Sequence, residues 1–223
     1  KAEKLTRQSA YYDQIEYAPN GQRIVAVRAP REQRAVVNDE INPKLIITDL
    51  VWIPAAGGNA TLVAPLTNAE RPHFSSDSTR VWVYDDADGL ISMRWDGTDR
   101  KAHLVVTGFQ QPGGGPNARP RRSTELQVSP DGHRVLARVD NKLFVVLLPM
   151  TGGPLPTVSA EQPNNAAIPF RRLSRIGGDF VGWNPDSKGL YYSMGRAFFQ
   201  YDLARADSLA ADSAAKAPPR PAA

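Results

Sequence analysis

The sequence contains no cysteine, and this absence excludes several kinds of chemistry. Without thiols the chain cannot form a disulfide framework, a thiolate metal site or a cysteine nucleophile. The sequence also lacks long apolar runs, because no segment approaches the roughly 18 consecutive apolar residues that a membrane-spanning helix needs. We therefore expect no membrane span in these 223 residues.

Histidine is scarce, with only His73, His103 and His133. A zinc site needs three or four converging ligands, whereas these three fall at different positions of the sequence repeat described below. We therefore predict no metal site and no cofactor. The Gly-x-Ser-x-Gly elbow of many serine hydrolases is missing as well, since Tyr191 replaces the first glycine before Ser193. We predict no catalytic residue, and hence a chain that is not itself an enzyme.

The formal net charge of +4 suggests a nucleic-acid partner at first sight. The arginine pairs Arg121-Arg122 and Arg171-Arg172, however, lie in proline-containing stretches with few aromatic residues for base stacking. We interpret these charges as solvated or protein-contacting, and we predict no binding of nucleic acid.

Turn-forming residues, by contrast, are plentiful. The 19 prolines and 17 glycines favour many turns and few long helices, and so an all-β fold. A segment with the pattern strand, tight turn, strand recurs four times along the chain. Its copies are 17–27, 74–83, 128–137 and 183–192.

The spacing of these copies is regular. Pro19, Ser76, Pro130 and Pro185, which we call the anchors, take the same place in each copy and lie 57, 54 and 55 residues apart. Proline fixes φ in such a turn, and Asp or Asn followed by Gly or Ser permits the tight reversal. The apolar flanks are typical of buried or half-buried strands. Each repeat is therefore predicted to begin with a hairpin.

A further apolar run follows each hairpin, and most of these runs lead through a glycine turn to another short strand. Four strands per repeat are typical of a propeller blade. We predict an all-β fold, a β-propeller or propeller arc of about four four-stranded antiparallel blades, over residues 1–205. The repeats lie near 13–67, 71–108, 123–160 and 177–205. A repeat of about 55 residues is longer than the usual propeller repeat of about 40–50. The additional residues lie in three loops, 29–43, 110–123 and 153–170.

The last repeat lacks an outer strand. After Leu203 the chain enters an Ala/Pro-rich segment, 206–223, which we predict to be a disordered tail because its prolines stop any helix. We hypothesise that Leu5 to Ala10 supply the missing strand and close the ring. An arc that stays open would instead keep an exposed edge strand that needs covering.

The repeats resemble those of TolB-type β-propellers over most of residues 13–205. The resemblance is closest at 126–132, 141–146, 177–183 and 193–203. It extends to the propeller portion of bacterial proteins in which such repeats precede a metal-dependent amidohydrolase domain. The His-x-His metal ligands of that domain have no counterpart here, so the resemblance implies a propeller without catalysis.

We hypothesise a non-catalytic accessory or scaffold subunit that binds protein partners, such as a membrane complex on its extracytoplasmic face, in the periplasm or another extracytoplasmic compartment. Loops on a rigid scaffold commonly carry recognition, and arginine pairs well with carboxylates and phosphates. The predicted contact residues are Arg119, Arg121, Arg122, Arg171 and Arg172. Two alternatives remain: the substrate-gating portion of an amidohydrolase whose catalytic domain is absent from this chain, and an open arc that docks through unpaired edges.

Aromatic residues have a structural interpretation. Trp52, Trp82, Trp95 and Trp183 are predicted to pack between blades, because aromatic rings bury a large area between stacked sheets. Trp95 and Trp183 each precede a turn, and either could instead line a binding rim.

Overall fold

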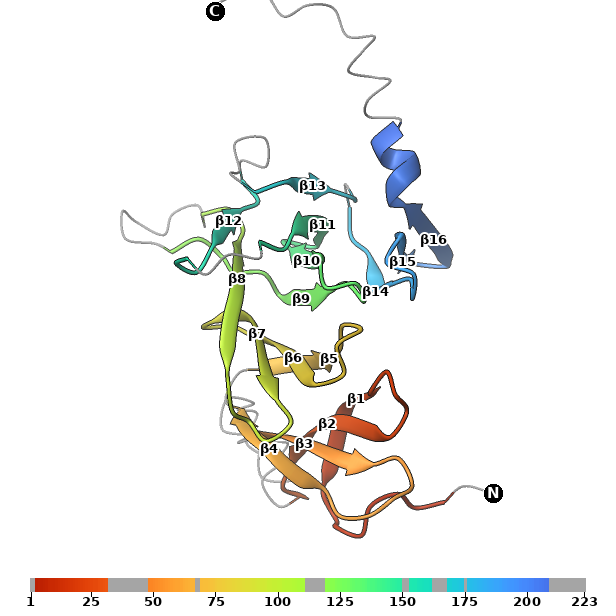
Figure 1. Cartoon of the computed structure of the whole chain (residues 1–223). Helices are drawn as coiled ribbons and strands as arrows, with labels where there is room; N and C mark the ends of the chain where they lie inside the picture. The colour runs from red at the N-terminus through yellow and green to blue at the C-terminus, as the bar shows by residue number, and fades with distance from the viewer. Residues whose placement is uncertain are drawn as a thin grey trace, which may run out of the picture.

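The structure is a computed structural model of the whole chain. It describes residues 3–31, 48–66, 69–110, 119–149, 153–161, 168–174 and 176–208. These residues form four sheets that follow one another along a curved arc, with the N-terminus at one end and β16 at the other (Figure 1). The predicted all-β propeller arc is confirmed.

Each sheet is one blade, and its strands come almost entirely from one sequence repeat. Blade 1 contains β1 (Tyr11–Tyr17), β2 (Arg23–Ala29), β3 (Thr48–Pro54) and β4 (Thr61–Leu66). Blade 2 contains β5 (Ala69–His73), β6 (Arg80–Asp85), β7 (Gly89–Arg94), β8 (Lys101–Thr107) and β12 (Thr157–Ser159). Blade 3 contains β9 (Glu125–Val128), β10 (Arg134–Val139), β11 (Lys142–Leu147) and β13 (Phe170–Arg172). Blade 4 contains β14 (Asp179–Trp183), β15 (Gly189–Met194) and β16 (Ala197–Asp202).

The turn after each anchor is held by the side chain that the sequence predicts. In all four repeats, the Oδ1 atom of the Asn or Asp after the anchor accepts a hydrogen bond from the backbone N–H two residues further on. The distances are 3.1 Å for Asn20, 2.9 Å for Asp77, 3.0 Å for Asp131 and 3.0 Å for Asp186. Such side-chain bonds replace a backbone turn bond, so the tight reversal is encoded locally.

Neighbouring blades stack through apolar side chains. Three clusters of buried residues lie between blades 1 and 2, blades 2 and 3, and blades 3 and 4. Trp82 is buried in the second of these clusters, and the rings of Trp52 and Trp95 meet edge to face at 6.3 Å between blades 1 and 2. The predicted packing role of these tryptophans is thus confirmed.

The hypothesis that the N-terminus closes the ring is wrong. Residues Leu5 and Thr6 lie against blade 1, where the Leu5 carbonyl accepts a hydrogen bond of 2.8 Å from the Gly58 N–H. Blade 1 and blade 4 are at opposite ends of the arc (Figure 1), so this segment cannot complete blade 4. Within the described residues, blade 4 has three strands.

The third repeat differs from its predicted extent. Residues 123–160 include β12, which pairs in parallel with β8 and so extends blade 2. The outer strand of blade 3 is β13, ten residues later, where Phe170 pairs with Val146. The loop expected at 153–170 therefore carries two short strands that connect it to two different blades.

The chain leaves β16 through a short helix at residues 203–208. Leu203 is buried between blades 3 and 4, and the Leu203 N–H donates to the Lys188 carbonyl at 3.0 Å. The predicted tail, 206–223, begins inside this helix, and residues 209–223 lie outside the described part of the chain. No helix of the described residues is long and apolar enough to cross a membrane.

Candidate functional site

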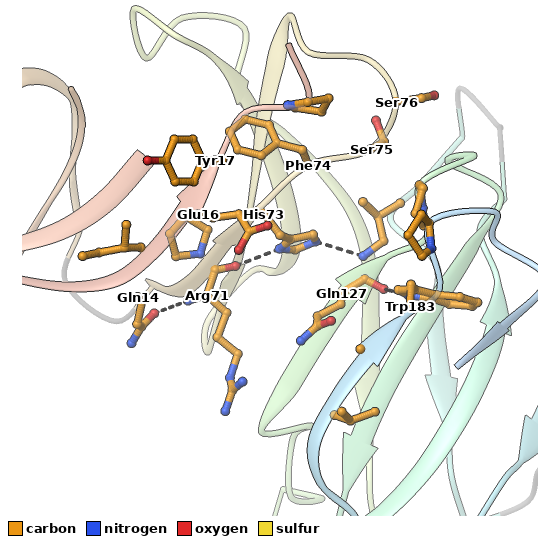
Figure 2. Close-up of a pocket in the computed structure, with 18 of the residues that line it drawn as sticks. Gln14, Glu16, Tyr17, Arg71, His73, Phe74, Ser75, Ser76, Gln127 and Trp183 are labelled. Carbon is orange, nitrogen blue, oxygen red and sulfur yellow. Dashed lines mark hydrogen bonds between the residues drawn. The ribbon is translucent and has the colours of Figure 1, made fainter. Parts of the chain in front are cut away.

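A cavity of about 770 Å³ lies on the inner side of the arc, where the first strand of every blade contributes residues (Figure 2). Every lining residue but two comes from the five positions before an anchor or from the anchor itself. The exceptions are Glu70, six residues before its anchor, and Tyr191 of β15. Because propeller blades place their first strand nearest the central axis, the sequence repeat itself brings four distant segments to one site.

The strands around this cavity carry unusual backbone geometry. Gln14, Arg71 and Phe180 each lie five residues before an anchor and have φ values of 52°, 55° and 50°. Each lies where the strand register shifts, at an equivalent bulge in β1, β5 and β14. A non-glycine residue in the left-handed region is costly and is concentrated at functional sites in proteins. Blade 3 has Glu125 at this position, in a regular strand.

Glu125 of blade 3 is the centre of an ion network that reaches blades 2 and 4. It is 1% exposed; Arg71 of blade 2 approaches one carboxylate oxygen at 2.8 Å and Arg138 approaches the other at 3.4 Å. Arg138 continues to Asp179 of blade 4 at 3.7 Å. Burial raises the pKa of the Glu125 carboxyl above its usual range, and the two guanidinium groups oppose that rise. A buried carboxylate needs such partners, so this ion network fixes how the blades sit around the cavity.

His73 joins blades 2 and 3 in the cavity wall. Its Nε2 atom accepts a hydrogen bond of 2.9 Å from the Val128 N–H, and its Nδ1 atom lies 2.8 Å from the Arg71 carbonyl (Figure 2). The Nδ1–H tautomer of neutral imidazole satisfies both contacts. Burial lowers the pKa of His73 to about 4, with the Arg71 carbonyl opposing the change. Both ring nitrogens are occupied, so His73 acts as a cross-link between blades.

Trp183 plays a similar part between blades 3 and 4. Its Nε1–H donates to the Gln127 carbonyl at 3.1 Å, and its ring lines the cavity. The ring also packs against the apolar cluster between blades 3 and 4, as predicted, and a role of Trp183 in a binding rim stays a prediction. Trp95, in contrast, lies against Trp52 and Phe74.

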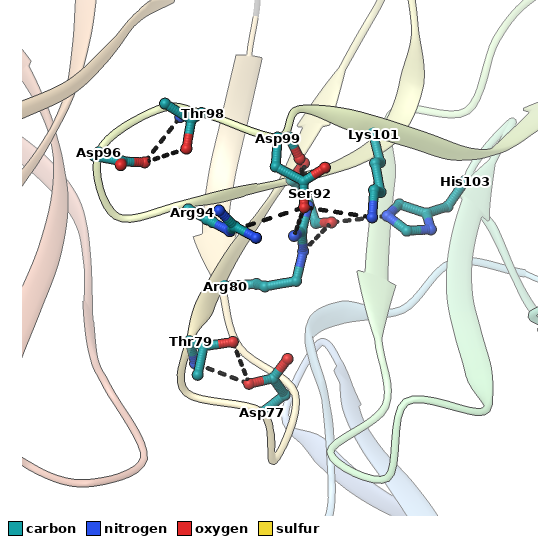
Figure 3. Close-up of polar contacts among 10 residues, drawn as sticks. All are labelled: Asp77, Thr79, Arg80, Ser92, Arg94, Asp96, Thr98, Asp99, Lys101 and His103. Atoms are coloured by element: carbon teal, nitrogen blue, oxygen red, sulfur yellow. Dashed lines mark hydrogen bonds and ion pairs between the residues drawn. The ribbon is translucent and has the colours of Figure 1, made fainter.

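A second partly buried histidine, His103, belongs to blade 2 rather than to the cavity. Its Nε2 atom contacts the Ser92 hydroxyl at 2.7 Å, and its ring lies 4.4 Å from that of Trp82. Ser92 also accepts a hydrogen bond from Arg80, whose guanidinium reaches Asp99 (Figure 3). Burial, with help from Arg80 and Lys101, lowers the pKa of His103 to about 4. The third histidine, His133, is exposed in a turn.

The histidines thus occupy three separate environments, as their repeat positions predict. Among the residues that the structure describes, no three His, Asp or Glu side chains are grouped so that they could hold a metal ion.

The five arginines predicted to contact a partner fall into two groups on different blades. Arg121 and Arg122 extend blade 2 beside β8, where Arg122 donates to the Ala87 carbonyl at 2.6 Å and Arg121 lies 3.8 Å from Asp140. Arg119, just before them, is exposed. The other two belong to β13 of blade 3. Their role in partner binding stays a prediction.

In the β13 pair, Arg171 is already engaged within the chain. Its guanidinium pairs with Asp207 of the short helix. Burial acts to lower the pKa of Arg171, but the hydrogen bond and charge of Asp207, together with Tyr201, outweigh it and raise the pKa. Arg172 is exposed on the same strand. The sequence could not indicate this engagement, because Asp207 lies in a segment that its composition assigns to a tail.

We expect stability to fall as the pH is lowered from about 6.5 to about 4, and His73 to contribute to that fall. The unfolded chain binds a proton on His73 near its ordinary pKa of about 6.5, whereas the folded chain does so only near 4. Between these values the unfolded state holds more protons, so acid favours unfolding. One pKa unit corresponds to about 1.4 kcal/mol, and for a partly exposed side chain we expect a loss of about 2 kcal/mol.

Urea unfolding of wild type and His73→Gln between pH 7.5 and pH 4 tests this expectation. The variant should be less stable at pH 7 but lose less stability on acidification. His133→Gln, at an exposed turn position, is the matched control and should follow wild type throughout. Parallel curves for His73→Gln and wild type would show that His73 is protonated in the folded state as readily as in the unfolded one.

Apart from Trp183, the cavity residues were not identified from the sequence, although a signal exists. Five residues before the anchors lie Gln14, Arg71, Glu125 and Phe180. Three residues before them lie Glu16, His73, Gln127 and Gly182, and two residues before them lie Tyr17, Phe74, Val128 and Trp183. These columns are mostly polar or aromatic, whereas the strands that follow the anchors are mainly apolar. A column-wise comparison of the repeats could therefore have indicated a shared inner surface.

Comparison with known proteins supports the fold. The sequence matches the family described as the lipoprotein LpqB β-propeller domain over residues 7–164. No curated protein matches it in sequence. A solved oligogalacturonate lyase in complex with manganese is similar in fold, with a TM-score of 0.58 and 12% identity, over 90% of this chain and 54% of that one.

Two further solved structures are more distant. A gluconolactonase from Xanthomonas campestris has a TM-score of 0.47 and 14% identity, over 84% of this chain and 55% of that one. A putative TolB from Agrobacterium tumefaciens has a TM-score of 0.46 and 14% identity, over 84% of this chain and 53% of that one. The chain thus spans just over half the length of each of these three structures.

The expected resemblance to TolB-type β-propeller repeats is confirmed at the level of the propeller fold. The family match covers more than half of the chain and all of blades 1 and 2. The chain belongs to the lipoprotein LpqB β-propeller domain family.

Proposed function

We propose that this chain is a non-catalytic recognition element, an accessory subunit that binds a protein partner through the inner side of its arc. The observation that carries the proposal is the exposure of Ile15 and Tyr17, each 57% exposed, on the strand of blade 1 that lines the cavity. Large apolar residues clustered in a hollow are typical of interaction sites.

The polar groups of the cavity wall support binding rather than catalysis. His73 uses both ring nitrogens for contacts with the backbone, and the Trp183 N–H is bonded to a carbonyl. The Ser75 hydroxyl accepts a hydrogen bond from the Asp77 N–H at 3.3 Å. A general base must reach the proton it removes, and His73 has no nitrogen left for that task.

An envelope location fits this role. The family takes its name from a lipoprotein, and the absence of cysteine suits an oxidising compartment. We propose a periplasmic or otherwise extracytoplasmic setting in which the arc forms part of a larger assembly.

Site-specific photo-crosslinking tests the proposal. A benzophenone amino acid is placed at position 17 in the protein as its own cells produce it, and adducts are identified by mass spectrometry. We expect one defined partner protein, and we expect Tyr17→Ala to weaken the association by about tenfold, as loss of a buried interface aromatic does. The matched control is position 62, because Leu62 is 51% exposed on β4, away from the cavity.

A probe at Arg119 examines the predicted arginine contact in the same experiment. If position 17 yields no more adduct than position 62 while position 119 yields the partner, the loops rather than the cavity are the binding surface. No adduct at either position refutes the proposal.

The alternative is a substrate-gating propeller of a metal-dependent amidohydrolase. It rests on the resemblance of the repeats in residues 13–205 to the propeller portion of such proteins. An adduct from position 17 that maps to a hydrolase domain with a His-x-His pair would establish this alternative in place of the accessory role.

A further inference from the structure

The cavity is acidic although the chain as a whole is basic. The formal net charge of the chain is +4. Among the described residues that line the cavity, however, the charged side chains are two carboxylates, Glu16 and Glu70, and one guanidinium, Arg71. Arg71 is already engaged, because it lies 2.8 Å from the buried Glu125 carboxylate. The described part of the lining therefore offers carboxylates to a ligand and no uncommitted cation.

Glu16 is a cavity carboxylate without a counter-charge. Its side chain is reachable from solvent on β1 and lines the cavity (Figure 2). Burial raises the pKa of the Glu16 carboxyl, and no charge among the described residues opposes that rise. His73 in the same wall is neutral near pH 7, because its pKa is lowered to about 4. A carboxylate held in a hollow without a cation is stabilised when a cation enters.

Aromatic rings share the lining with this carboxylate. Tyr17, the next residue of β1, is 57% exposed, and the ring of Trp183 lines the same cavity. The faces of such rings attract guanidinium and ammonium groups. The chain shows this attraction elsewhere, because the Arg23 guanidinium lies 4.4 Å from the centre of the Trp52 ring and 5.0 Å from that of Trp95. Carboxylate and aromatic rings together form a lining that suits a cation.

The backbone of the cavity wall argues against an added β-strand as the ligand. The Arg71 N–H donates to a side chain of blade 1, the Val128 N–H donates to a ring of blade 2, and the Gln127 carbonyl accepts from a ring of blade 4. A peptide that adds a strand to a sheet needs a row of unpaired backbone groups at the edge. Side chains of neighbouring blades take up such groups on β5 and β9, so we expect the ligand to reach into the hollow with a side chain.

We propose that the cavity binds an arginine side chain of the partner protein, with the guanidinium on the Glu16 carboxylate and against the Tyr17 ring. This inference rests on the proposed function, because it assigns a chemistry to the partner that the cavity binds there. Arginine fits better than lysine, since its planar guanidinium binds a carboxylate through two parallel hydrogen bonds and also stacks on aromatic rings. Complementary charge across an interface contributes specificity.

An NMR titration of the purified chain with N-acetylarginine methylamide tests the cation contact without the partner. We expect the backbone amide signals of Glu16 and Tyr17 and the indole N–H signal of Trp183 to shift, with a dissociation constant on the order of millimolar. N-acetylcitrulline methylamide has nearly the same shape without the charge, and it should bind at least about fivefold more weakly. The amide of Leu62, which lies outside the cavity lining, is the internal control and should not shift.

The variant Glu16→Gln removes the charge and keeps the shape of the side chain. It should fold like wild type, because no charge among the described residues stabilises the Glu16 carboxylate. It should bind the arginine probe at least about fivefold more weakly and reduce the position-17 adduct about tenfold. Glu161→Gln replaces an exposed glutamate outside the cavity lining, and this matched control should leave both measurements unchanged.

The outcomes separate this inference from the proposed function. Equal binding of the arginine and citrulline probes, or equal binding of the arginine probe by wild type and Glu16→Gln, would overturn the inference. A position-17 adduct that Glu16→Gln leaves unchanged would also overturn it, while the proposed function stands. If position 17 yields no adduct at all, both proposals fail, and binding of the arginine probe would then identify a free small cation as the occupant.

Discussion

Gly97→Ala is expected to destabilise the chain by at least about 3 kcal/mol, the range of severe overpacking. Gly97 lies in the turn between β7 and β8 of blade 2 with φ of +77°, and a Cβ built on it would lie 2.1 Å from the Val63 carbonyl oxygen of blade 1. The backbone that carries this oxygen cannot shift easily, because the residues on either side of Val63 pair with β3. The turn cannot move away either, since Arg80 holds Asp99 at its end by an ion pair of 2.6 Å.

Gly132→Ala is the matched control for this substitution. Gly132 also has φ of +77°, but no atom lies within 4 Å of its added Cβ. It should therefore show only the backbone cost of a left-handed alanine, about 1 kcal/mol. Urea unfolding of both variants separates the steric cost from the conformational one. Equal losses for the two glycines would mean that blades 1 and 2 do not approach at Gly97 in solution.

Leu143→Ala should cost about 3 kcal/mol, whereas Phe198→Ala should change stability by no more than about 0.5 kcal/mol. The two residues hold the same repeat position in blades 3 and 4, yet they are 0% and 64% exposed. Removing a fully buried leucine leaves a cavity between blades 3 and 4, while removing an exposed ring leaves none. The pair tests whether blade 4 is the uncovered end of the arc.

Chemical denaturation of the two variants at one protein concentration is the measurement. If Phe198→Ala costs as much as Leu143→Ala, the aromatic face is packed in solution. Repeating the measurement at several concentrations would then show whether a second copy covers it, since association makes apparent stability depend on concentration.

The strands and turns are the part of the fold that the sequence predicts well. Asp77 and Asp131 hold their turns through bonds to residues two positions away, and the apolar flanks of each turn alternate or run as strands do. These features depend on short segments, and a short segment carries its own turn chemistry. The regular spacing of the anchors then extends one hairpin to four blades.

The candidate site is predicted only in part. The sequence indicates that the histidines do not converge, and they do not. It does not indicate that Arg71, Glu125 and Arg138 form one ion network, because Arg71 belongs to blade 2 and meets the Glu125–Arg138 pair of blade 3 only when the blades stack. Arg171 shows the same limit, since its partner Asp207 lies in a segment with the composition of a tail.

By itself the sequence determined that this chain is a run of four propeller repeats, because local turn chemistry and a regular period are written in consecutive residues. Only the tertiary structure decided which edge each short strand joins and which faces stay open. β12 pairs with blade 2, Leu5 lies on blade 1, and Phe198 is left uncovered. Several sheet edges can accept a short apolar strand with similar local energy. The choice among them depends on long-range packing between blades, and no single segment of the chain encodes that packing.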